Sequence, residues 1–288
     1  MARAAAKTGA MPAVIVAIEQ RFPKDQRIIA DDLAYAMLPF GMKAFVWLMR
    51  PAFARDWMVR ATEKAAPGIW ALMACRKRYI DEKLIEAVDE VDAVVNLGAG
   101  FDTRVYRLPT LADVPVWEID QPENIGPKRR RLHKQFGAIP PHVNLVPIDF
   151  DRQDLGAVLT AHGYSAAART FFIWEGVTQY LTQAGLVATF EFLARAARGS
   201  RLTFTYVRKD FIDGKATHGH EDLYKRLVVK GVWLSGMEPD HVEPFLDPFG
   251  WRVIEHIGYQ ELVDRYVKPT GRELAFTPVE RIVYAEKL

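Results

Sequence analysis

Hydrophobic and polar positions follow two different patterns along the chain, and the change falls near residue 90. Before that point apolar residues recur at helical spacing and no strand pattern occurs. This part predicts helices at 33–38, preceded by the capping pair Asp31 and Asp32, and at 42–60 and 69–88. Beyond it, short β-branched runs predict strands at 91–97, 114–119, 143–148, 170–174 and 201–206, separated by helices at 123–136, 155–162 and 183–197.

The strands of the second part are apolar on both faces and alternate with helices. This arrangement predicts a parallel sheet covered on both sides and built from right-handed βαβ units. The rhythm breaks after the fifth strand and resumes with predicted strands at 251–257 and 282–285. We therefore expect a doubly wound, Rossmann-like α/β fold in four parts. These are a helical N-terminal layer (1–90), a core (91–206), a substrate cap inserted between strands five and six (207–250) and the closing strands (251–288).

Charge and cysteine content exclude several classes of protein. The net charge of +2 is too balanced to indicate a nucleic-acid partner, and the basic run Lys128–Arg131 fits a solvated helix face. Cys75 is the only cysteine, which excludes an internal disulfide and cysteine-cluster metal sites. No apolar stretch approaches the length of a membrane span, and the first residues do not resemble a cleavable leader. A cytoplasmic protein without a nucleic-acid or membrane partner is expected.

A glycine loop follows the first predicted strand. In the run Asn96–Arg104, Gly98 and Gly100 let the backbone turn tightly and approach a ligand at the carboxyl end of a strand. The small residue that ends a dinucleotide fingerprint is replaced by Thr103. The loop therefore predicts a nucleotide-type ligand but disfavours NAD and FAD.

Acidic residues end the next strands. Asp120 follows Gly98 by 22 residues, the position from which a carboxylate accepts hydrogen bonds from ribose hydroxyls, and Glu118 is the second choice. After the third strand, Asp149 is either an acceptor for an adenine amino group or, like Asp151, the N-cap of the following helix. Glu175 ends the fourth strand and is a candidate partner for a ligand ammonium.

The chain resembles the leucine carboxyl methyltransferase-like family, which includes protein phosphatase methyltransferases and tetracenomycin-type polyketide carboxyl methyltransferases. The resemblance covers about residues 70–288 and is specific for family and cofactor, but weak for substrate. It is carried by the segments Arg76–Asp81, Val94–Leu108, Glu118–Pro122, Trp174–Leu181 and Glu280–Ile282. Phe101 and Val177–Gln179 depart from many relatives, and because they flank the crevice we expect them to tune the acceptor pocket.

The resemblance implies a class I methyltransferase whose cofactor is S-adenosyl-L-methionine (SAM). It assigns Arg76 to the methionine carboxylate, with Arg78 as the competing candidate, and Glu175 to the ammonium. By the same resemblance, the remaining cofactor contacts are Gly98, Ala99 and Gly100 under methionine and ribose, Asp120 and Gln121 at the ribose, and Asp149 with Phe150 at adenine.

The family also implies O-methylation of a carboxylate on a small metabolite or polyketide-like acceptor. An ionised carboxylate needs no general base, whereas a phenol would benefit from one. Candidate catalytic residues are Tyr206, Arg208, His218 and His220, and Arg208 or Lys209 is suited to orient an acidic substrate. The pair His218 and His220 lies in a glycine-containing loop and is more typical of a polar surface turn or the lead-in to a helix N-cap, so no metal site is expected.

Two other functions stay open on the residues alone. A nicotinamide-dependent dehydrogenase uses a similar sheet, and a non-catalytic SAM-binding protein would keep the same motifs. The oligomeric state is not predicted.

Overall fold

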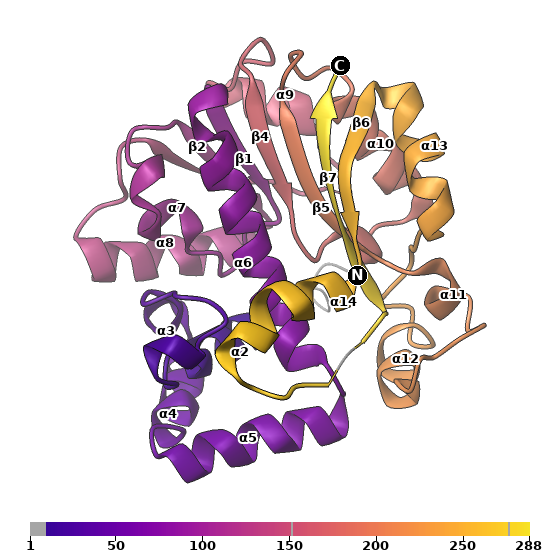
Figure 1. Ribbon diagram of the computed structural model, residues 1–288. Coiled ribbons are helices and arrows are strands. Elements are labelled where there is room, and N and C mark those ends of the chain that lie inside the picture. The colour runs from indigo at the N-terminus through magenta and orange to yellow at the C-terminus, as the bar shows by residue number, and fades with distance from the viewer. Residues whose placement is uncertain (1–9, 151, 276) are drawn as a thin grey trace.

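The computed structural model describes residues 10–150, 152–275 and 277–288, and its centre is a seven-stranded sheet (Figure 1). The strand order is β3-β2-β1-β4-β5-β7-β6. The strands are β1 (Ala93–Leu97), β2 (Val116–Asp120), β3 (Val143–Pro147), β4 (Thr170–Trp174), β5 (Arg201–Val207), β6 (Trp251–Ile257) and β7 (Glu280–Lys287). All predicted strands are present, and the doubly wound α/β prediction is confirmed.

The direction of β7 departs from the expected parallel sheet. Strands β1 to β5 pair in parallel, but β7 lies antiparallel between β5 and β6. The sheet is therefore mixed. The strand order reverses between β1 and β4, which is the switch point where doubly wound sheets open a crevice at the carboxyl ends of their strands.

Both faces of the sheet are covered, as the apolar strands predict. Successive residues of a strand point to opposite faces, so Val94 and Val95 enter two separate hydrophobic clusters. The first cluster includes residues of α2, α6, α8 and α14, and the second includes residues of α9, α10 and α13. Figure 1 shows α6 crossing in front of the sheet, while α5 lies at the base of the molecule.

The helices before β1 are α2 (Ala10–Glu19), α3 (Ala34–Met37), α4 (Phe40–Leu48), α5 (Ala52–Ala65) and α6 (Ile69–Ala87). The cap at Asp31 is as predicted, because its carboxylate accepts the N–H groups of Leu33 and Ala34. The single helix predicted at 42–60 is wrong. Pro51 disfavours the helical conformation of the residue before it, so α4 ends and α5 begins on either side of the proline.

The later helices are α7 (Arg104–Arg107), α8 (Pro122–Phe136), α9 (Leu155–Ala161), α10 (Gln183–Leu193), α11 (Lys209–Ile212), α12 (Glu221–Leu227), α13 (Val242–Leu246) and α14 (Tyr259–Leu262), which a π-helical turn extends at Val263–Val267. Within the described ranges, no helix is both long enough and apolar enough to cross a bilayer.

The segment between β5 and β6 has two different surroundings. Helix α13 packs on the sheet, where Phe245 contacts the ring of Phe190. Residues 223–233, in and after α12, instead lie at the cavity described below. The substrate cap and its boundaries at 207 and 250 therefore stay a prediction, and only the part around α12 is placed to act as one.

The expectation of a solvated basic face on α8 is wrong for Lys128. Its side chain is 2% exposed, and its ammonium lies 2.7 Å from Oε1 of Glu118. Glu118 is fully buried on β2 and also accepts from the hydroxyl of Tyr106. This pair holds α8 against the sheet, and it leaves Glu118 occupied rather than available to a ribose.

Candidate functional site

A cavity of about 850 Å³ opens at the carboxyl ends of the central strands. Its sheet side is formed by the segments after β1, β2 and β4, and its other walls come from α2, α5, α6 and residues 223–233. This position is the switch point of the sheet, where ligands bind in doubly wound folds.

The glycine loop forms the floor of the cavity. Gly98 has a φ of +79°, and a Cβ atom there would lie 2.4 Å from Cγ2 of Val177. Gly100 has a φ of +39°, and its N–H donates to Oδ2 of Asp120 at 2.6 Å. Only glycine fits the first position, because a side chain would meet both a strained backbone and a neighbour. The loop is thereby held against the end of β2.

Asp120 keeps one acceptor position open toward the cavity. Its Oδ1 accepts from the N–H of Gln121 at 2.7 Å and from Nδ2 of Asn124 at 2.8 Å, while Oδ2 accepts from Gly100. A carboxylate has about four lone-pair sites, so one remains for a ligand hydroxyl. Burial raises the pKa of this carboxyl, and the hydrogen bonds from Asn124 and the two N–H groups oppose that shift.

Arg76 on α6 joins two acidic residues from distant parts of the chain. Its Nε donates to Oε1 of Glu175 at 2.9 Å, and its Nη1 donates to both carboxylate oxygens of Glu280 at 2.9 and 3.1 Å. Its Nη2 makes no hydrogen bond to a described residue, and a Cβ atom on Gly176 would lie 3.0 Å from it. One edge of the guanidinium therefore remains for a ligand.

A buried network of charges surrounds Arg76 and its two acidic partners. Arg104 is fully buried and donates from Nη2 to Oε2 of Glu175 at 2.6 Å, and the ammonium of Lys77 lies 3.5 Å from the same oxygen. The network consists of the bases Arg76, Lys77, Arg104 and Arg107 and the acids Asp31, Asp81, Asp102, Glu175 and Glu280.

The pKa values of the two acids bound to Arg76 are shifted in opposite directions. Burial would raise the pKa of the Glu175 carboxyl, but Lys77, Arg104 and Arg76 outweigh it and lower that pKa to about 2. For Glu280 burial dominates and raises the pKa, although Arg76 opposes it. Glu175 is thus a fixed negative charge in the cavity wall.

Most of the predicted cofactor residues share this cavity. Those that line it are Arg76, Gly98, Ala99, Gly100, Asp120, Gln121, Phe150 and Glu175. Arg78 lies elsewhere, since its Nε donates to Glu82 and its Nη1 donates to the carbonyl of Ile28. Of the two competing arginines, the structure places only Arg76 at the cavity.

Asp149 is not among the lining residues. Its carboxylate is about half exposed and lies 3.7 Å from Nε of Arg152. The alternative role as helix cap belongs to Asp154, whose Oδ1 accepts from the N–H of Ala157 at 2.7 Å. Asp151, the other candidate cap, lies outside the described residues.

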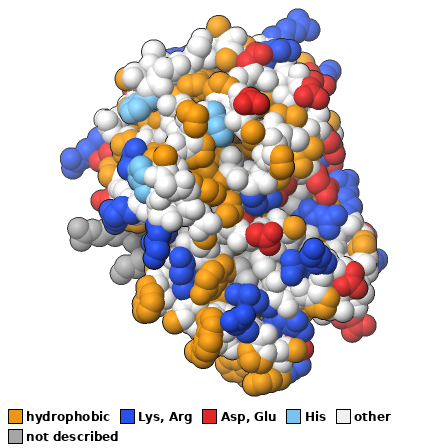
Figure 2. Space-filling model, turned by 90° about the vertical axis from the view of Figure 1, so that its left-hand side faces the viewer, with side chains coloured by type: hydrophobic (Ala, Val, Ile, Leu, Met, Phe, Trp, Pro, Cys, Tyr) orange, Lys and Arg blue, Asp and Glu red, His pale blue; other side chains and the backbone are white. Residues whose placement is uncertain are grey.

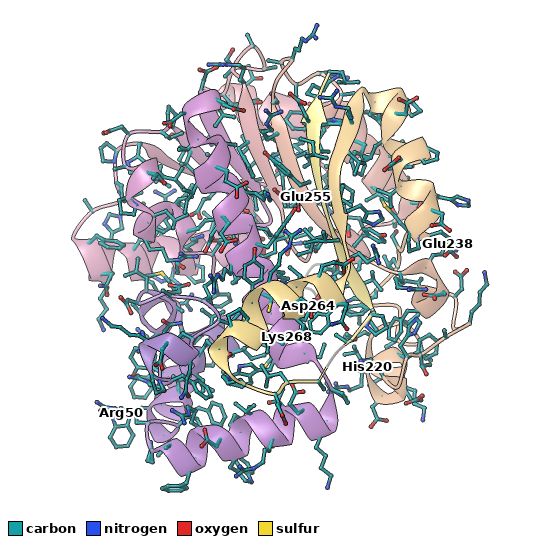
Figure 3. The ribbon with its side chains drawn as sticks, in the orientation of Figure 1. Arg50, His220, Glu238, Glu255, Asp264 and Lys268 are labelled. Carbon is teal, nitrogen blue, oxygen red and sulfur yellow. The ribbon has the colours of Figure 1, made fainter. Side chains whose placement is uncertain are left out.

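The candidate catalytic residues do not line the cavity. The hydroxyl of Tyr206 lies 2.7 Å from Nε2 of His256 on the neighbouring part of the sheet. Arg208 and His218 both pair with Asp210, at 2.6 and 3.2 Å. His220 is buried at the start of α12 (Figure 3).

Lys209, the other candidate for orienting an acid, pairs with Asp213 at 2.6 Å and also lies outside the cavity wall. The two histidines belong to no cluster of three His, Cys, Asp or Glu side chains that would hold a metal in the described part of the chain.

Three lining residues that were not among the predicted cofactor contacts carry buried polar atoms without a hydrogen-bond partner in the described residues. These atoms are Nδ2 of Asn96, Oε1 of Gln179 and Nε1 of Trp233. Buried polar groups are nearly always paired, so atoms of this kind at a cavity indicate a polar ligand. Asn96 gave a signal in the sequence, since it is the one amide in the apolar run of the first strand.

Comparison with known proteins decides the family. The sequence profile of the leucine carboxyl methyltransferase family matches residues 9–194. The chain belongs to the leucine carboxyl methyltransferase family. A relative from Mycobacterium avium, provisionally named as a SAM-dependent methyltransferase, is 31% identical over 277 residues, covering 91% of this chain and 88% of that protein. A Mycolicibacterium gilvum relative with the same provisional name is 34% identical over 226 residues, covering 74% of this chain and 71% of that protein.

A solved structure agrees at the level of the fold. A provisionally named methyltransferase from Thermobifida fusca superposes with a TM-score of 0.58 at 15% identity, covering 94% of this chain and 97% of that one. Family membership confirms the resemblance seen in the sequence and the predicted enzyme class, a SAM-dependent methyltransferase. It leaves no support for the dehydrogenase alternative.

The low pKa of Glu175 predicts how stability changes with pH. A carboxyl whose pKa is depressed on folding stabilises the protein above its unfolded pKa, near 4.5, and this contribution is lost as the pH falls toward about 2. We expect the free energy of unfolding of the wild type to fall more steeply across this window than that of Glu175→Gln. Urea titrations at successive pH values measure both. Glu90→Gln, in an exposed ion pair with Arg201, should keep the wild-type slope. Equal slopes for wild type and Glu175→Gln would contradict the assignment.

Proposed function

We propose that the protein is a SAM-dependent O-methyltransferase whose acceptor is a carboxylate on an apolar small molecule. The observation that carries the proposal is the two-ended character of the cavity. Its sheet end holds paired charges and glycines, whereas its helical end is lined by apolar side chains and opens beside two exposed bases.

The sheet end fits the cofactor. We assign Arg76 to the methionine carboxylate through its open Nη2, Glu175 to the ammonium, and the open acceptor site of Asp120 to a ribose hydroxyl. We also assign Phe150, which lines the cavity, to cover the adenine. The charge network contains five acids and four bases, and an excess of acid suits a cofactor whose sulfonium and ammonium outweigh its carboxylate. When bound, SAM supplies an electrophilic methyl group.

The helical end suits an apolar acceptor. Its walls include Val16, Met58, Ala61, Leu72, Met73, Leu223, Leu227 and Val232. Arg226 and Lys230 also line the cavity, and both are exposed and make no ion pair with a described residue. Two unpaired bases beside an apolar cavity favour an acceptor that carries a negative charge.

The side chains at the cavity also favour a carboxylate over a phenol or alcohol. None of the described lining residues is a histidine or a cysteine, and the acids Asp102, Glu175 and Glu280 are occupied by bases. A carboxylate with a pKa of about 4 is already ionised at neutral pH, so it needs no proton acceptor. The work left to the protein is to align the acceptor oxygen and exclude water.

The open edge of Arg76 predicts the effect of its loss on cofactor binding. Arg76→Met should raise the dissociation constant for SAM about tenfold or more, because a charge-assisted hydrogen bond contributes about 1.5–3 kcal/mol. Isothermal titration measures it, with circular dichroism to check the fold. Arg76→Lys keeps the charge without the planar fork and should bind with intermediate affinity. Arg78→Met serves as the matched control, two residues along the same helix. A loss of affinity confined to Arg78→Met would move the role to that residue.

Asp120→Ala tests the ribose assignment. The variant should no longer bind SAM or S-adenosylhomocysteine, since it removes both the hydroxyl acceptor and the group that holds Gly100. Titrations of wild type and variant with these two ligands and with NAD⁺ measure the effect. Unchanged affinity for SAM in a folded variant would contradict the assignment of Asp120 to the ribose. Binding of NAD⁺ alone to the wild type would reopen the dehydrogenase alternative.

The acceptor class is tested with radiolabelled SAM and a panel of long-chain and aromatic carboxylic acids, phenols and alcohols. We expect label in products that release methanol in base, because methyl esters hydrolyse under these conditions and methyl ethers do not. Arg226→Glu with Lys230→Glu should raise KM for the acid about tenfold and change kcat less. Lys225→Glu, exposed on the same helix but outside the cavity wall, should behave as wild type. Base-stable products would overturn the carboxylate proposal, and SAM binding without any product would favour the non-catalytic alternative.

A further inference from the structure

Helices α4 and α5 carry an unusual number of exposed aromatic side chains. Six large hydrophobic residues in this stretch are between 36% and 87% exposed, and together they make up what we call the aromatic surface: Phe40, Phe45, Trp47, Leu48, Phe53 and Trp57. They account for half of the twelve large exposed hydrophobic residues in the described chain. Large exposed apolar patches usually mark a site of interaction.

Basic side chains border the aromatic surface. Arg50, Arg60 and Lys64 are exposed and form no ion pair with a described residue. Figure 2 shows hydrophobic side chains gathered at the lower end of the molecule beside basic ones, and Figure 3 labels Arg50 at the outer edge of this helix pair.

The charge of this segment exceeds that of the whole chain. Residues 40–66 contain five basic and two acidic residues, a net charge of +3, against +2 for all 288 residues. The acids do little to offset it at the surface. Asp56 pairs with the adjacent Arg55, and Glu63 turns inward to accept the N–H groups of Gly68 and Ala275. The aromatic surface is therefore set in positive potential.

We propose that the aromatic surface docks on a bilayer containing anionic lipids. Exposed Trp, Phe and Leu side chains bordered by Lys and Arg are the composition with which helices bind in the plane of a membrane interface. Tryptophan and phenylalanine enter the boundary between headgroups and acyl chains, and the bases are drawn to anionic headgroups. This peripheral contact needs no spanning helix. It departs from the absence of a membrane partner expected from the sequence.

Charge complementarity favours a lipid surface over a second copy of the chain. A two-fold dimer through this patch would bring the same surface of each protomer together. Arg50, Arg60 and Lys64 of both copies would then lie in one interface of net positive charge, and this repulsion opposes association. An anionic lipid surface instead supplies the opposite charge at every position.

Helix α5 connects the aromatic surface to the cavity. Phe53, Trp57, Arg60 and Lys64 recur at helical spacing on its outer face, while Met58, Ala61, Thr62 and Ala65 on its inner face line the cavity. A docked molecule would thus hold one cavity wall against the bilayer, where an amphipathic acid is concentrated. This link to the acceptor rests on the proposed function, but the docking itself does not.

Sedimentation with vesicles tests the docking without SAM or acceptor. Wild-type protein should partition into mixed phosphatidylcholine–phosphatidylglycerol vesicles about tenfold or more strongly than into phosphatidylcholine alone. Its tryptophan emission should shift to shorter wavelength on binding. The double variant Phe53→Ser with Trp57→Ser, and separately Arg60→Glu with Lys64→Glu, should each lose most of the partitioning.

Matched control variants make the same kinds of substitution outside the aromatic surface. Val229→Ser removes an exposed hydrophobic residue, and Arg195→Glu with Arg198→Glu reverses two exposed charges beyond α10. Both should bind vesicles as the wild type does, and every variant should keep the wild-type melting temperature. Equal partitioning of wild type and the α5 variants would overturn the proposal. A second result would also overturn it. In this result the wild type does not bind anionic vesicles, and sedimentation velocity shows a dimer that Phe53→Ser with Trp57→Ser dissociates.

Discussion

The buried contact of Arg76 with Glu175 and Glu280 is the interaction on which the rest of the site depends. Three elements meet there, namely α6, the segment after β4 and the start of β7. Charges taken out of water are costly unless every one of them is paired, and removing a single partner leaves the others uncompensated. The contact therefore fixes the position of α6 over the sheet edge, and with it the cavity wall that α6 provides.

The same pairing explains why this part of the sheet is suited to binding rather than only to stability. Arg76 and Asp120 are each held by protein groups, yet each keeps one hydrogen-bonding position open to the cavity. Side chains locked by their neighbours lose little freedom when a ligand arrives. Preorganisation of this kind comes from contacts between distant segments of the chain. The glycine loop contributes differently, because its lack of side chains leaves room for a ligand.

The sequence allowed the fold to be predicted because its signals are local. Apolar runs marked every strand, but Pro51, read as part of one long helix, was overlooked as a break. The antiparallel direction of β7 was also not predicted. The choice between Arg76 and Arg78 was beyond local reasoning. Two residues along a helix differ by about 200° in direction, and the sequence does not say which face meets the sheet.

Residues that depend on long-range pairing were harder to predict. Glu280 was seen only as part of a closing motif, and Lys128 was expected on a solvated face. Tyr206 and His218 drew attention as reactive types, but each is satisfied by a nearby partner away from the cavity. Residue type indicates which chemistry is possible, and only packing decides where it is available.

The place of β7 in the chain has a consequence for synthesis. Glu280 follows Arg76 by 204 residues and is carried by β7, which is the last strand of this sheet in chain order and inserts between two strands already translated. Chains fold progressively as they leave the ribosome. Until β7 arrives, β5 and β6 lack their common neighbour and the guanidinium on α6 lacks one carboxylate. A chain stopped before residue 280 would expose an unpaired strand edge, and quality-control proteases would have a means to distinguish it from the finished protein.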